Sequence, residues 1–137
     1  MKVDQIYWVG QKAFIERGGE VLVLTDANGE GLDFPGGKIQ EGEKDLAESL
    51  KREVREEVNL EIDVGKPFIT WHNAFPAHHK YAGKKVYLVG FNCKYISGDV
   101  SLSDEHNKFR WVNKDNYMKV DDVTSYFEIL DKYFKQS

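Results

Sequence analysis

The chain has 137 residues, the length of one ordinary domain, and 41% of them are hydrophobic, enough for a core. Its formal net charge of −4 provides no broad basic surface for a nucleic-acid polymer, whereas a small phosphorylated ligand is compatible because a bound cation reverses the local field. Cys93 is the single cysteine, which excludes an intrachain disulfide, and no apolar run reaches the roughly 18 residues that span a bilayer. We therefore expect a single domain over residues 1–137 in a soluble cytoplasmic protein that binds no membrane.

The first third of the chain has the alternation and turn residues typical of β-strands. Strands are predicted at 6–15, 21–25 and 32–34. The sequence RGG at 17–19 predicts a hairpin turn, and PGG at 35–37 interrupts the strand pattern. A helix is predicted at 45–58, ending at Asn59, because asparagine is the usual second choice after glycine for the left-handed residue at a helix end.

Strands also dominate the rest of the chain. They are predicted at 68–72, 85–95 and 109–112, the first two separated by a polar and aromatic loop. A C-terminal helix is predicted from about Asp122, with apolar residues on one side at Val123, Phe127, Leu130 and Phe134. The order of elements indicates an α+β or mixed-sheet sandwich fold.

The helix predicted at 45–58 carries an acidic face that overlaps its apolar stripe. At about 100° per residue, Glu53, Glu56 and Glu57 share one face. The stripe comprises Leu46, Leu50, Val54 and Val58. Partial burial of such a cluster costs several kcal/mol per unpaired charge, so it requires cationic partners. Oxygen ligands of this kind suit Mg²⁺ or Mn²⁺, although a solvated acidic face balanced by neighbouring lysine and arginine residues is the alternative.

The segment at 37–60 resembles the signature of the Nudix hydrolase family, which reads G, five residues, E, seven residues, R-E-U-x-E-E-x-G-U, with U a bulky aliphatic residue. Its fixed positions are filled here by Gly37, Glu43, Arg52, Glu53, Val54, Glu56, Glu57 and Leu60. The chain departs from the pattern twice: eight residues separate Glu43 from Arg52, and Asn59 replaces the last glycine. The extra residue shifts Glu43 relative to the helix and leaves the residues after it in phase.

The resemblance extends beyond the signature. The sequence LDFPG at 32–36 precedes it as in many family members, and RWV at 110–112 is similar to a strand found near the family's C-terminus. The resemblance therefore covers nearly the whole chain and is closest to the small MutT-like members. It implies an α/β/α sandwich around a mixed β-sheet, within the α+β class, and hydrolysis of a nucleoside diphosphate linked to another group.

The resemblance also implies roles for individual residues. Glu53, Glu56 and Glu57 would hold Mg²⁺ or Mn²⁺, with the carbonyl oxygen of Gly37 as a further ligand, because breaking a diphosphate bond requires charge neutralisation and an activated water. Arg52 would orient a carboxylate rather than transfer a proton.

A fourth acid is expected in the loop before the last predicted strand. Glu105 lies six residues before Trp111, from where MutT-like proteins direct a glutamate to the metal ions, and it would act as a metal ligand or general base. Asp104 is its immediate competitor, and a plain surface loop is the alternative. Glu43 is left between capping the helix start and supporting the metal ions.

The predicted substrate-binding residues are Gly36, Lys38, Phe75, His78 and Asp121. Gly36 would let phosphate oxygens approach the backbone. Phe75 would stack on a nucleobase, and His78 would contact a phosphate or base. Asp121 would accept hydrogen bonds from a base edge. The alternatives are a core aromatic for Phe75, a loop residue for His78 and a helix cap for Asp121.

The resulting hypothesis is metal-dependent hydrolysis of a nucleoside triphosphate or a modified nucleotide, giving the monophosphate and pyrophosphate. ADP-ribose or another nucleoside diphosphate sugar is the alternative, because Pro76 follows Leu60 by sixteen residues, roughly where ADP-ribose hydrolysing members have a proline. A non-catalytic nucleotide-binding module is supported only by the extra residue after Glu43. The expected partner is thus a small nucleotide, and homodimerisation is left open.

Overall fold

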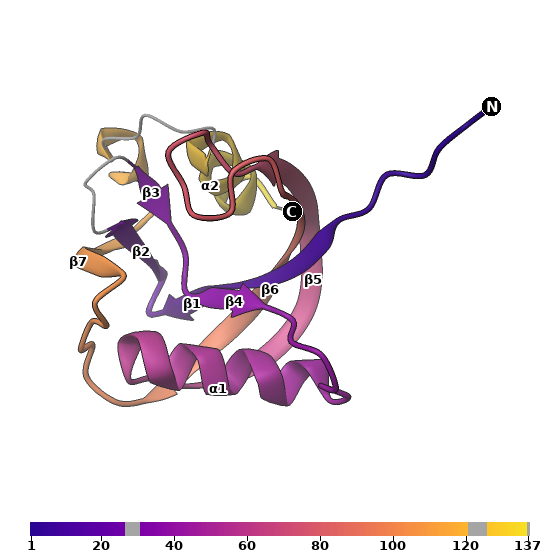
Figure 1. Cartoon of the computed structure of the whole chain (residues 1–137). Helices are drawn as coiled ribbons and strands as arrows, with labels where there is room; N and C mark the ends of the chain where they lie inside the picture. The colour runs from indigo at the N-terminus through magenta and orange to yellow at the C-terminus, as the bar shows by residue number, and fades with distance from the viewer. Residues whose placement is uncertain (27–30, 121–125, 137) are drawn as a thin grey trace.

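The computed structural model places a mixed β-sheet between two helices (Figure 1). It describes residues 1–26, 31–120 and 126–136. The strands are β1 (Trp8–Arg17), β2 (Glu20–Asp26), β3 (Leu32–Asp33), β4 (Gly36–Lys38), β5 (Glu61–Ala74), β6 (Lys85–Ser97) and β7 (His106–Val112). The helices are α1 (Leu46–Val58) and α2 (Tyr126–Phe134), with a short 3-10 helix, η1 (Tyr117–Lys119), before α2. This is the α+β sandwich that the sequence predicts.

The strand β1 lies at the centre of the sheet, whose order is β3-β2-β1-β6-β5. The pair β1 and β6 is parallel, whereas the other pairs are antiparallel. Two strands branch from this path, because β4 pairs with β1 and β7 pairs with β2. The branch through β4 leads directly into α1 and so connects the centre of the sheet to the predicted acidic helix.

Both faces of the sheet are buried, as expected when successive strand residues point to opposite sides. Ala13 and Ile15 of β1 pack in one core cluster with Leu50 of α1, whereas Phe14 belongs to a second cluster with Leu130 of α2. Figure 1 shows the same arrangement, with α1 and α2 on opposite sides of the sheet. None of the described helices is long and apolar enough to cross a lipid bilayer.

The ends of α1 follow their local sequence signals. The Asp45 carboxylate accepts a hydrogen bond of 3.1 Å from the Glu48 N–H, and Asn59 adopts the left-handed conformation with φ 64°. One stripe residue differs from the prediction, because Leu46 is 40% exposed at the first turn. The hairpin predicted at 17–19 is also present, with φ 58° at Gly18 and 84° at Gly19.

Two strands differ from the sequence prediction. The turn expected at 35–37 instead leads into β4, because Gly36 has φ 152° and a Cβ there would lie 1.9 Å from the carbonyl oxygen of Gln11. Only glycine lets the chain run this close to β1. The strand predicted at 68–72 extends over the whole of β5, and the breaking residues Gly65 and Pro67 lie at its register shifts. The start of the helix predicted from Asp122 lies outside the described residues.

Candidate active site

The predicted acidic residues line one open pocket of about 300 Å³. Its lining comprises Glu53, Glu56, Glu57, Ser103, Asp104 and Glu105. The three glutamates of α1 lie at different depths, since Glu57 is buried at 7% exposure, Glu53 is half-buried and Glu56 is exposed. The pocket therefore brings together the acids of α1 and both candidate acids of the loop between β6 and β7.

The loop before β7 is attached to the C-terminal end of α1. The N–H of Ser101 donates to the carbonyl of Val58 at 3.0 Å, and the N–H of Ser103 donates to the carbonyl of Glu57 at 2.9 Å. Carbonyl groups of the last helical turn have no hydrogen-bond partner within the helix. These two bonds therefore satisfy carbonyls that α1 leaves unpaired. They also place Glu105, two residues after Ser103, beside the acidic face of α1.

The glycine loop contacts the same acids from the other direction. The N–H of Gly36 donates a hydrogen bond of 2.6 Å to Oε2 of Glu57. A Cβ at Gly37 would lie 2.6 Å from the carboxylate of Glu53, so a side chain at this position would displace that group. Gly36 and Gly37 thus lie against the two deeper glutamates of α1.

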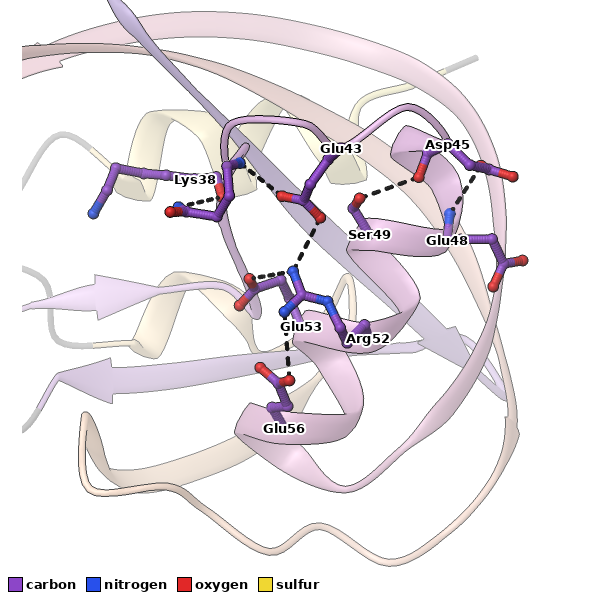
Figure 2. Close-up of polar contacts among 9 residues, drawn as sticks. Lys38, Glu43, Asp45, Glu48, Ser49, Arg52, Glu53 and Glu56 are labelled. Carbon is purple, nitrogen blue, oxygen red and sulfur yellow. Dashed lines mark hydrogen bonds and ion pairs between the residues drawn. The ribbon is translucent and has the colours of Figure 1, made fainter.

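Arg52 connects three carboxylates on the outer side of α1, as Figure 2 shows. Its Nη2 lies 3.0 Å from Oε2 of Glu43 and 3.2 Å from Oε1 of Glu53, and its Nη1 lies 3.5 Å from Oε1 of Glu56. Glu43 also accepts a hydrogen bond of 2.6 Å from the N–H of Gln40. The extra residue between Glu43 and Arg52 therefore does not separate their side chains.

Behind the pocket the side chains of Lys12, Asp33 and His106 contact one another in a row, which we call the charged row. Lys12 of β1 lies 3.0 Å from Oδ1 of Asp33, whose Oδ2 lies 3.0 Å from Nε2 of His106. The other ring nitrogen of His106 lies 3.8 Å from Oε1 of Glu57. The imidazole of His106 is only 3% exposed. A half-buried ion pair in the sheet is thus connected through one histidine to the deepest glutamate of the pocket.

The pKa values reflect this burial. Burial opposes ionisation of Asp33, but the charge of Lys12 and the hydrogen bond from His106 lower the pKa of Asp33 to about 2. Burial raises the pKa of Glu57 to about 7, against the charge of Lys12. Burial also raises the pKa of Glu53, against the charge of Arg52. Burial therefore opposes negative charge at both glutamates, and a cation bound in the pocket would offset this cost.

The donor set fits a divalent cation. Glu57, Glu105 and His106 each offer one ligand atom, and these atoms all lie within 4.8 Å of one another. Neither Glu53 nor Glu56 belongs to such a close group among the described residues. Carboxylate oxygens are typical ligands of Mg²⁺ and Mn²⁺, and the nitrogen donor extends the range to other transition metals.

The structure does not bring the predicted substrate-binding residues together at one place. Gly36 touches the acidic pocket, whereas Lys38 and Phe75 lie together in an aromatic cluster. The Lys38 Nζ lies 4.5 Å from the ring centroid of Tyr81 and 5.8 Å from that of Phe75. His78 is exposed in the loop between β5 and β6, and Asp121 lies outside the described residues.

Sequence reasoning missed the charged row of Lys12, Asp33 and His106. One signal was available in the sequence, because Lys12 directly precedes the apolar run at 13–15 within a predicted strand, where lysine rarely lies without a partner. His106 follows the predicted acid Glu105 directly and gave no signal of its own.

Comparisons with known proteins agree with this arrangement. The NUDIX domain model matches residues 9–133. The nucleoside triphosphatase NudI of Klebsiella pneumoniae is 29% identical over 124 residues, covering 78% of this chain and 82% of that protein. The crystal structure of the MutT protein from Methanosarcina mazei Go1 matches with a TM-score of 0.76 and 28% identity, covering 98% of this chain and all of that one. The solution structure of the E. coli ORF135 protein shares the fold, with a TM-score of 0.74, 21% identity, and 93% and 88% of the two chains covered.

Proposed function

The chain belongs to the NUDIX family and is a Nudix pyrophosphohydrolase, and on this basis we propose that its substrate is a nucleoside triphosphate or a modified nucleotide. Hydrolysis would release the nucleoside monophosphate and pyrophosphate. The observation that carries this proposal is the pocket in which the acids of α1 meet those of the loop before β7. The similarity to a nucleoside triphosphatase supports the choice of substrate.

In this proposal the acids of α1 hold the metal ions. Glu53, Glu56 and Glu57, with the carbonyl oxygen of Gly37, would bind Mg²⁺ or Mn²⁺. The bound ions would neutralise phosphate charge and lower the pKa of a coordinated water. Arg52 would position the carboxylates it contacts, because its planar guanidinium fixes their direction.

Glu105 is proposed to hold a metal ion through one carboxylate oxygen and to accept the proton of the attacking water through the other. Its ligand atom lies within 4.8 Å of those of Glu57 and His106, an arrangement that Asp104 does not share among the described residues. In the reaction the water oxygen bonds to phosphorus, the bond from that phosphorus to the bridging oxygen breaks, and the water proton passes to the carboxylate. The leaving group takes the electrons of the broken bond; it is pyrophosphate if the α-phosphorus is attacked and the monophosphate if the β-phosphorus is attacked.

Two alternatives have less support. Hydrolysis of ADP-ribose rests on the position of Pro76 alone. A non-catalytic module rests on the extra residue after Glu43, yet Glu43 keeps its contact with Arg52 despite that insertion. The inserted residue therefore gives the non-catalytic alternative no structural support.

A substrate panel with identified products tests the proposal. The panel includes the common nucleoside triphosphates, 8-oxo-dGTP, ADP-ribose and dinucleoside polyphosphates, each with Mg²⁺ and with Mn²⁺. We expect a triphosphate to give monophosphate and pyrophosphate, with ¹⁸O from labelled water in one of the two products. Preference for ADP-ribose would contradict the substrate class, and absence of turnover throughout would favour the binding module.

A further inference from the structure

We propose that His106 supplies a nitrogen ligand, through Nδ1, to a divalent metal ion that it shares with Glu57 and Glu105. The inference rests on the proposed function, because it takes these two glutamates as metal ligands. It adds a histidine to a metal site whose other ligands are oxygen atoms. It also gives the charged row behind the pocket a role, because Lys12 and Asp33 hold that histidine in place.

The first support is a buried nitrogen atom with no hydrogen-bond partner. The Nδ1 atom of His106 has none among the residues that the structure describes, although its side chain is only 3% exposed. An unsatisfied polar group in such surroundings costs about 1–3 kcal/mol. Buried polar atoms without partners are rare and require an explanation, such as an ion that the atom binds.

The second support is the orientation that the neighbours impose on the imidazole ring. The Nε2 of His106 lies 3.0 Å from Asp33, and Asp33 is held as a carboxylate by Lys12 at 3.0 Å. A carboxylate only accepts hydrogen bonds, so Nε2 carries the proton and donates it. In the neutral ring the lone pair is then on Nδ1. Histidines that bind metals commonly donate their other N–H to a carboxylate in this way.

The third support is the spacing of the donor atoms. The distance from Nδ1 of His106 to Oε1 of Glu57 is 3.8 Å, too long for a hydrogen bond. It does leave room for one ion at about 2.1 Å from each atom. The other oxygen of Glu57 is engaged by the N–H of Gly36, so Oε1 is the oxygen that faces the histidine. Glu105 completes the group.

A nitrogen ligand predicts a metal preference. Mg²⁺ prefers oxygen ligands alone, whereas imidazole suits transition metals such as Mn²⁺, Co²⁺ and Zn²⁺. We therefore expect the nucleotide-free protein to bind Mn²⁺ more tightly than Mg²⁺. If His106 served only as a charged partner of Glu57, both ions would be held through oxygen alone.

Pulsed electron paramagnetic resonance of the Mn²⁺-loaded full chain tests this coordination directly. We expect the ¹⁴N modulation of a coordinated imidazole in the wild-type protein, its loss in His106→Gln, and its retention in His79→Gln, where the histidine lies in the loop between β5 and β6. Bound Mn²⁺ without ¹⁴N modulation in the wild-type protein would overturn the proposal.

A second variant keeps the test decisive if His106→Gln does not fold. Asparagine at position 33 can donate to Nε2 and so move the ring proton to Nδ1, which removes the lone pair while leaving the histidine present. We expect Asp33→Asn to weaken Mn²⁺ binding by about 10–100-fold, measured from the signal of free Mn²⁺. Unchanged binding would contradict the inference. Neither measurement requires a nucleotide, so nitrogen coordination and hydrolysis can fail independently.

Discussion

Glu57 is the residue on which the pocket depends most, because it is buried and its two oxygens have different neighbours. One accepts the N–H of Gly36 and the other faces His106 and the pocket. Glu57→Gln keeps an oxygen for Gly36 but removes the charge that a metal ion requires. We predict a loss in kcat/KM of at least ~100-fold, equivalent to about 2.7 kcal/mol of transition-state stabilisation.

The control for this variant is Glu48→Gln on the same helix. Glu48 lies outside the pocket and pairs with Lys51 at the surface, so its loss should leave kcat/KM within about twofold. Steady-state kinetics with the preferred nucleotide of the substrate panel makes the comparison. Near-normal activity of Glu57→Gln would contradict the assignment of Glu57 as a metal ligand.

At the scale of single residues, the sequence predicts the burial or contacts of a side chain when these depend on nearby residues, and fails when they depend on distant ones. The overlap of Glu57 with the apolar stripe follows from the helical period alone, and the structure buries this residue. The environment of His106 does not follow in this way, because Asp33 is 73 positions distant and reaches it only through strand pairing. Sequence therefore predicted the acids but not the side chains behind them.

Among the elements, the end of α1 decides where the loop with Glu105 lies. Asn59 ends the helix with φ 64°, and its side-chain N–H donates to the carbonyl of Asp99 at 3.2 Å. Asn59→Ala and Asn59→Gly both remove that bond, but only alanine is strained in the left-handed conformation. We predict that the alanine variant is less stable than the glycine variant by about 1 kcal/mol.

Urea unfolding of both variants measures this difference in the free energy of unfolding. Because the side-chain hydrogen bond is absent from both, the comparison isolates the backbone strain. Equal stabilities would show that the backbone relaxes at this position, and the fixed helix end would then not explain how the loop is held.

The helices and strands differ in how well their boundaries could be predicted from the sequence. The boundaries of α1 were predictable because capping signals at Asp45 and Asn59 are local. The strand β4 was not, since its pairing depends on a close approach to Gln11 that appears only in three dimensions. The extension of β5 was missed for a related reason, because its pairing with β6 continues through a glycine and a proline that usually end strands.

At the scale of the whole molecule, the pair of Lys12 and Asp33 connects the central strand to β3, and His106 extends the connection to β7. The pKa of Asp33 is about 2 in the folded protein against an ordinary 3.8, so the folded state holds the proton of this carboxyl less tightly. Ionised Asp33 therefore contributes stability above about pH 4. This contribution is lost as the pH falls toward 2.

The difference between the two pKa values corresponds to about 2 kcal/mol of stability at neutral pH. In metal-free protein we predict that Asp33→Asn lowers the free energy of unfolding at pH 7 by about this amount, because the variant lacks the charge that Lys12 and His106 stabilise. The gap from the wild-type protein should narrow as the pH falls below 4, where the wild-type carboxyl itself begins to lose its stabilising charge. Urea unfolding at pH 7, 5 and 3 measures the gap, with Asp63→Asn on the exposed side of β5 as the control that should change little. A gap of the same size at pH 7 and pH 3 would mean that packing, rather than the buried charge, makes Asp33 necessary for the fold.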